Sequence, residues 1–226
     1  MLFRSECNGC GQCAVDCPFD AISVQTRTDG ARWEYEVAVN EKLCAACGIC
    51  VGSCHSSNPF RSSGKVLETG IDMPQFPIDE VRSRTKAALD ALTGETRLIV
   101  FGCDHAFDAA ELKSRNIAAM SFLCTGMVPP TLVEYALKNG ADGVFITGCR
   151  NGDCYYRYGN VWMDKRFNEG RKPMLRERVD RSRIHVFRAA VTDGRQIKNE
   201  LAGFSIRIDA LQNAPVNSAS GEDGNA

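Results

Sequence analysis

Apolar and polar residues follow a regular pattern along the second half of the chain. Four short apolar runs are typical of buried strands, and they lie at residues 97–101, 117–123, 142–147 and 184–190. Stretches with helical character follow these runs, at residues 107–113, 129–138, 160–178 and 193–201. Strands that alternate with helices predict an α/β domain with an open parallel sheet, Rossmann or flavodoxin-like, with helices on both faces.

The first part of the chain shows a different pattern. Two alternating stretches, residues 21–26 and 32–39, flank Asp29-Gly30 and predict a β-hairpin. Residues 66–95 read as a linker with one helix, which Asp79 or a neighbour caps and which runs to Leu92. We therefore expect domains at residues 1–65 and 96–205. Residues 206–226 should be a mostly disordered tail, because the end of the chain is rich in Asn, Ser and Gly.

Composition is that of an ordinary globular protein and excludes two classes of function. Hydrophobic residues make up 44% of the chain, yet no apolar run approaches the roughly 18–20 residues that span a bilayer. A formal net charge of −1 gives no indication of nucleic-acid binding. Because the first cysteine stands at position 7, we expect no signal peptide, and the lack of a long apolar run predicts no transmembrane segment. The many thiols are best explained as metal ligands in the reducing cytoplasm.

Twelve cysteines carry the distinctive chemistry, and eight of them form two runs in the first part of the chain. Both runs have the spacing C-x2-C-x2-C-x3-C, which is typical of [4Fe–4S] clusters, and in such runs the fourth cysteine crosses to the other cluster. The first cysteine set is therefore Cys7, Cys10, Cys13 and Cys54. The second cysteine set is Cys44, Cys47, Cys50 and Cys17. Structural zinc is the alternative, although zinc sites usually use two separated pairs of ligands.

The remaining four cysteines form a third cysteine set: Cys103, Cys124, Cys149 and Cys154. The first three each follow the carboxyl end of a predicted strand, and the fourth lies five residues beyond the third. Because such strand ends gather at one edge of a parallel sheet, we expect these thiols to form a metal site there. The alternative is four small buried core residues. The spacing alone leaves [2Fe–2S], another cubane and zinc open.

Two family resemblances follow from these residues. Residues 1–65 resemble a two-cluster bacterial ferredoxin, which implies an α+β ferredoxin-like domain with two [4Fe–4S] clusters. Residues 96–205 resemble the delta subunit of methyl-viologen-reducing hydrogenase, which is also called the hydrogenase iron–sulfur subunit. The second resemblance is carried by Cys103, Cys124-Thr125-Gly126, Asn139-Gly140-Ala141-Asp142-Gly143-Val144, Gly148-Cys149, Gly152-Asp153-Cys154 and Tyr158-Gly159-Asn160. It implies one [2Fe–2S] cluster on the third cysteine set.

The second resemblance also implies a function. A protein of this kind passes electrons between a donor or acceptor oxidoreductase and a flavin-containing, heterodisulfide-reductase-like partner, often in flavin-based electron bifurcation. The chain shows no G-x-G-x-x-G and no P-loop, so we expect the flavin on the partner and a non-catalytic role for this chain. The alternative is a catalytic iron–sulfur reductase with substrate at the third metal site. Catalysis would need an open iron position, whereas twelve cysteines fill three sites of four ligands.

A basic run near the end of the second domain is open to two interpretations. Residues 165–188 contain nine Lys and Arg against three acidic residues. Such a run is usually a solvated face. Given the expected role in electron transfer, it could equally be a docking surface for an acidic partner.

Overall fold

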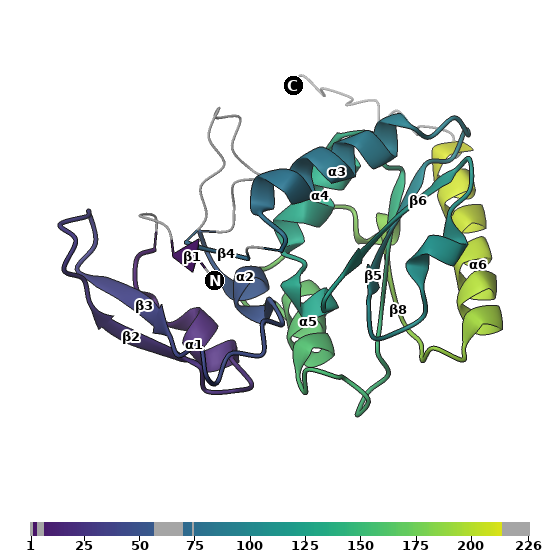
Figure 1. Ribbon diagram of the computed structural model, residues 1–226. Coiled ribbons are helices and arrows are strands. Elements are labelled where there is room, and N and C mark those ends of the chain that lie inside the picture. The colour runs from purple at the N-terminus through teal and green to yellow at the C-terminus, as the bar shows by residue number, and fades with distance from the viewer. Residues whose placement is uncertain (1, 4–6, 57–69, 74, 214–226) are drawn as a thin grey trace, which may run out of the picture.

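The structure, a computed structural model, describes residues 2–3, 7–56, 70–73 and 75–213 (Figure 1). In the first part of the chain, β2 (Ile22–Thr26) pairs antiparallel with β3 (Tyr35–Val39), which confirms the predicted hairpin. Two short helices, α1 (Gln12–Asp16) and α2 (Ile49–Ser53), lie beside each other. The residue before each helix is a glycine with φ near 75°, a conformation that favours glycine over other residues.

Residues after position 65 complete the first part of the fold. The short strand β1 (Leu2–Phe3) pairs antiparallel with β4 (Ile71–Asp72). Asp72 then accepts a hydrogen bond from the backbone N–H of Ile78 at 3.1 Å, where α3 (Ile78–Asp90) begins. We expected Asp79 or a neighbour to cap this helix; its N-cap is Pro77, and the preceding strand supplies the carboxylate that accepts from the first N–H of the helix.

The second part is an α/β domain with a four-stranded parallel sheet, as predicted. Its strands are β5 (Leu98–Cys103), β6 (Ile117–Phe122), β7 (Gly143–Gly148) and β8 (Ile184–Arg188). Their order across the sheet is β6-β5-β7-β8, and every neighbouring pair is parallel. Sequence order therefore reverses direction between β5 and β7.

Helices cover both faces of this sheet (Figure 1). On one face, Ile99 and Phe101 pack in a core with side chains from α3, α4 (Pro130–Lys138) and α5 (Gly159–Asn168). On the other face, Leu98 and Val100 pack with α6 (Gly194–Asn213) and the 3₁₀ helix η2 (Ala109–Leu112). Alternate residues of β5 thus serve two separate cores, as expected for a strand covered on both sides.

Three predicted elements differ from the structure in length. The stretch at 107–113 forms only the 3₁₀ helix η2, because Asp108 accepts from the N–H of Ala110 and closes a tight turn. The basic helical region at 160–178 ends at Asn168, followed by Gly170 with a φ of 74°. Another short 3₁₀ helix, η4 (Arg181–Arg183), precedes β8.

The last helix is longer than predicted. We expected it to end near Leu201, but α6 runs to Asn213, so residues 206–213 of the predicted tail are helical. The buried positions Ile197, Leu201, Phe204 and Ile208 continue the same helical face against the sheet, which explains the extension. Residues 214–226 lie outside the described part of the chain. No helix in the described ranges has both the length and the hydrophobicity needed to cross a membrane.

Candidate metal centres

The first cysteine set lines one cavity at the start of the chain. Its cysteines come from α1 and the loop before it, and from the residue that follows α2, so Cys54 lies beside three cysteines of the first run. Gly70 and Ile71, next to and within β4, close the same cavity. Burial, followed by the nearby charges of Cys54, Cys10 and Cys7, raises the pKa of the Cys13 thiol to about 12.

The second cysteine set lines a separate cavity. Burial raises the pKa of the Cys47 thiol to about 11, and burial together with the neighbouring thiols raises the pKa of Cys50 well above its usual range. Backbone N–H groups point at two of the sulfurs, from Ala21 to Cys17 and from Ala46 to Cys44, each at 3.4 Å. Such N–H donors stabilise negative charge on thiolate sulfur.

These two cavities fit iron–sulfur clusters better than mononuclear metal ions. Four sulfurs surround each open space. A cubane cluster occupies a space of this kind, because its four irons each take one thiolate at a corner.

The third cysteine set lies at one edge of the parallel sheet. Cys103 is the last residue of β5, Cys124 follows β6, and Cys149 directly follows β7. The sulfurs of Cys103 and Cys149 are 3.9 Å apart, and both residues are buried. β5 and β7 are the strands between which sequence order reverses, and ligands of open α/β sheets bind at that point.

The four thiols of the third cysteine set form one hydrogen-bonded group. Hydrogen bonds from Cys124 and Cys149 lower the pKa of both Cys103 and Cys154. The same bonds raise the pKa of Cys124 and Cys149 above the usual range of a thiol. Cys103 and Cys154 thus each contact both Cys124 and Cys149, an arrangement that core cysteines without a common role would have no reason to adopt. A bound metal centre would take all four as thiolates and compensate their mutual repulsion.

Gly159, the first residue of α5, leaves room for this group of sulfurs. A Cβ atom at Gly159 would lie 2.1 Å from the sulfur of Cys124 and 3.6 Å from that of Cys154. The neighbouring Gly126, where a Cβ atom would lie 2.8 Å from Gly159, donates its backbone N–H to the sulfur of Cys124 at 3.4 Å. Two glycines thus allow backbone to approach the site as closely as sulfur ligands require.

We expect Gly159→Ala to displace Cys124 and to lower the metal content of the third site without removing any cysteine. Overpacking of this kind destabilises a protein by about 1–3 kcal/mol. Gly203→Ala on α6 is the matched control, because a Cβ atom there would meet only an Arg207 nitrogen at 3.7 Å, and alanine favours a helix. The measurement is iron per chain together with the midpoint of unfolding. Full iron content in Gly159→Ala would contradict the expected crowding.

The second and third cysteine sets adjoin each other. Cys47, Ile49 and Cys124 belong to one buried apolar cluster, against which Cys154 also packs. A Cβ atom at Gly52 of α2 would lie 2.2 Å from the carbonyl oxygen of Gly126. Backbone therefore packs directly on backbone where α2 meets the 3₁₀ helix η3 (Thr125–Met127).

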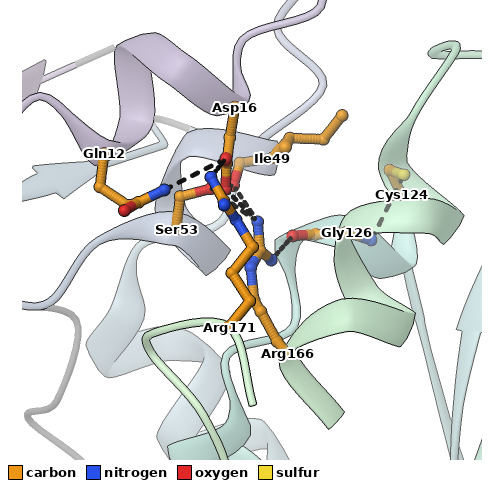
Figure 2. Close-up of polar contacts among 8 residues, drawn as sticks. All are labelled: Gln12, Asp16, Ile49, Ser53, Cys124, Gly126, Arg166 and Arg171. Carbon is orange, nitrogen blue, oxygen red and sulfur yellow. Dashed lines mark hydrogen bonds and ion pairs between the residues drawn. The ribbon is translucent and has the colours of Figure 1, made fainter. Parts of the chain in front are cut away.

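A buried polar network crosses the same contact, and no motif in the sequence predicts it. We call it the Asp16 network; it consists of Asp16, Ser53, Arg166 and Arg171 (Figure 2). The side chains of Asp16 and Arg166 are completely buried, and their ion pair measures 3.2 Å. Ser53 lies 2.6 Å from both groups, and Arg171 pairs with the other carboxylate oxygen of Asp16. The network thus joins α1 and α2 to α5.

This network and the Arg176–Glu134 ion pair correct the interpretation of part of the basic run. Arg166 is buried, while Arg171 and Arg176 are half-buried in ion pairs with Asp16 and Glu134. Neither a solvated face nor a docking surface describes these three arginines. The acidic partners of these arginines lie far away in the sequence, so the local pattern does not indicate the ion pairs. For that reason the sequence alone predicts an exposed basic run.

Comparisons with known proteins agree with this two-part organisation. Residues 6–58 match the 4Fe-4S dicluster domain. A ferredoxin:CoB-CoM heterodisulfide reductase subunit of Methanosarcina mazei is 24% identical over 149 residues, covering 62% of this chain and 19% of that protein. An F420-non-reducing hydrogenase iron-sulfur subunit of Archaeoglobus profundus is 32% identical over 88 residues, covering 39% of this chain and 64% of that protein.

The chain thus spans about a fifth of the first relative and just under two thirds of the second. A shorter match joins it to the F420-non-reducing hydrogenase iron-sulfur subunit of Methanococcus voltae, 43% identical over 51 residues, or 23% of this chain and 35% of that protein. Residues 98–212 match the family model for the methyl-viologen-reducing hydrogenase, delta subunit, and this match includes the entire third cysteine set. Because it covers half of the chain, the protein belongs to the family of the methyl-viologen-reducing hydrogenase delta subunit.

Proposed function

We propose that this protein is an electron-transfer subunit with three iron–sulfur centres. The first and second cysteine sets hold one [4Fe–4S] cluster each, and the third cysteine set holds a [2Fe–2S] cluster. The observation that carries the proposal is that all twelve cysteines gather into three groups of four, two of which meet across Ile49. Such clusters, when bound, supply one-electron transfer.

The residues of the chain bind the clusters, exclude water from the space between them and compensate the negative charge of the sulfurs. Each set provides four thiolates, so no iron position is left for a substrate. Ile49 is completely buried and excludes water between the second and third sets. Backbone N–H groups of Ala21, Ala46 and Gly126 donate to cysteine sulfurs and offset their negative charge.

The fold of the second domain supports the placement of the third centre. The strand order β6-β5-β7-β8 corresponds to 2-1-3-4 in chain order, which is the arrangement of flavodoxin-like sheets. We infer that the domain is of this doubly wound kind. The third cysteine set then takes the position at the sheet edge where related folds hold a cofactor.

The relatives indicate the class of partner. They carry the names of a heterodisulfide reductase subunit and of hydrogenase iron–sulfur subunits. We propose that this protein exchanges electrons with a donor or acceptor oxidoreductase and with a flavin-containing, heterodisulfide-reductase-like subunit, in an arrangement suited to flavin-based electron bifurcation. The flavin belongs to the partner in this proposal.

Metal analysis and a redox assay test the proposal together. The anaerobically purified chain is expected to contain about ten irons, from two cubanes and one two-iron cluster, and no flavin. It should exchange electrons with viologen dyes and turn over no metabolite by itself. Addition of a flavin-containing partner should allow the dye-reduced chain to reduce that flavin. Zinc in place of iron, or substrate turnover by the flavin-free chain, would contradict the proposal.

A further inference from the structure

The guanidinium group of Arg166 joins the backbone of two metal-site segments. Its Nη1 atom donates to the carbonyl oxygen of Gly126 at 2.7 Å, and Nη2 lies 3.4 Å from the carbonyl oxygen of Ile49 (Figure 2). Gly126 belongs to the loop after β6 that carries Cys124, and Ile49 begins the helix α2 that carries Cys50. One planar, buried cation therefore contacts both the second-set and the third-set segments.

The two residues that Arg166 joins also donate hydrogen bonds to cysteine sulfurs. The backbone N–H of Gly126 donates to the sulfur of Cys124 at 3.4 Å. The backbone N–H of Ile49 donates to the sulfur of Cys47. A continuous path of covalent and hydrogen bonds thus leads from the second cysteine set through Arg166 to the third.

We propose that Arg166 is a positioning residue that holds the second and third cysteine sets at a fixed separation and orientation for electron transfer; this inference rests on the proposed function. Arginine suits the role because its rigid fork presents donors in several directions within one plane. Asp16 and Ser53 supply the charge and the hydrogen bonds that allow a cation to be fully buried there. The Asp16 network therefore supports the arginine, and the arginine orients the two sites.

The charge of Arg166 has a second consequence. Each centre gains negative charge when it is reduced, and a nearby cation stabilises that form. Because Arg166 lies between the two sets in a region without water access, its charge acts on both with little screening. We therefore expect this residue to raise both reduction potentials in addition to fixing the geometry.

Variants of the full chain separate the two effects. Arg166→Gln removes both the charge and the guanidinium contacts with the carbonyl oxygens of Gly126 and Ile49. Arg166→Lys keeps the charge but replaces the planar guanidinium by a single ammonium group. Arg176→Gln is the matched control, because Arg176 also pairs with a buried carboxylate, that of Glu134 on α4. Each cluster-loaded protein is reduced with dithionite and measured by electron paramagnetic resonance, redox titration and amide hydrogen exchange.

The electron paramagnetic resonance signal of the reduced wild-type protein is expected to be split by the interaction between the centres on the second and third cysteine sets. Arg166→Gln should lose this splitting, lower both midpoint potentials and speed exchange around Ile49 and Gly126, with iron content unchanged. Arg166→Lys should lose the splitting and keep the potentials, and Arg176→Gln should match wild type in splitting, in both potentials and in exchange around Ile49 and Gly126. If Arg166→Gln does not fold, Ser53→Ala replaces it; this variant removes the hydroxyl group beside Nη2 and should weaken the splitting.

Two results would overturn the inference. One is wild-type splitting in both Arg166 variants at full iron content. The other is a wild-type chain that holds all three centres but shows no splitting. A wild-type chain that holds fewer than three centres would contradict the proposed function instead, so the two failures are distinguishable.

Discussion

Replacement of Cys149 by alanine is expected to remove one of three iron–sulfur centres and leave the other two intact. Cys149 hydrogen-bonds to both Cys103 and Cys154, so its loss leaves three sulfurs where the site needs four ligands. The first and second cysteine sets line cavities that Cys149 does not border. Iron per chain should fall by about two, and the signal of the two-iron cluster should disappear from the reduced spectrum.

Cys10→Ala is the reciprocal control for this experiment. Cys10 lines only the first cavity, so its variant should lose one cubane and keep the third centre. Electron flow from a dye to the flavin-containing partner should fall in Cys149→Ala, while the ferredoxin part remains reducible. Unchanged spectra in Cys149→Ala would mean that Cys149 is a buried core residue and not a metal ligand, which is the alternative interpretation of the third set.

Asp16→Ala is expected to lower the free energy of unfolding by about 3–5 kcal/mol, the usual effect of leaving a buried charge without its partner. Asp16 pairs with Arg166 and Arg171, and its side chain is completely buried. Its removal leaves the Arg166 cation in a site closed to water, where only neutral groups remain within hydrogen-bond distance. Urea unfolding of wild type and variant under identical anaerobic conditions measures the difference.

An exposed ion pair of the same chain provides the control for this prediction. Lys86 and Asp90 on α3 lie 2.7 Å apart, with side chains 54% and 56% exposed. Asp90→Ala should therefore lower stability by less than about 1 kcal/mol, because solvent screens such pairs. Equal losses in Asp16→Ala and Asp90→Ala would mean that the Asp16 network does not stabilise the fold.

The local sequence determined the strands, the hairpin and the grouping of the cysteines. Cysteine spacing places three thiols within one loop, so the short reach of the chain itself brings them together. Runs such as 97–101 are apolar on both faces, which is the pattern of a strand covered by helices, and β5 has this environment. Cys103 and Cys149 could be placed together in advance because parallel strands end at a common edge.

Only the tertiary structure decided how the two parts of the chain meet. Asp16 and Arg166 are 150 residues apart, and their burial depends on the packing of α1, α2 and α5. In the sequence, Arg166 is one cation in a basic run, and Asp16 is an ordinary residue between two cysteines. Desolvation and pairing of charges are set by long-range contacts, so no local pattern distinguishes a buried arginine from a solvated one.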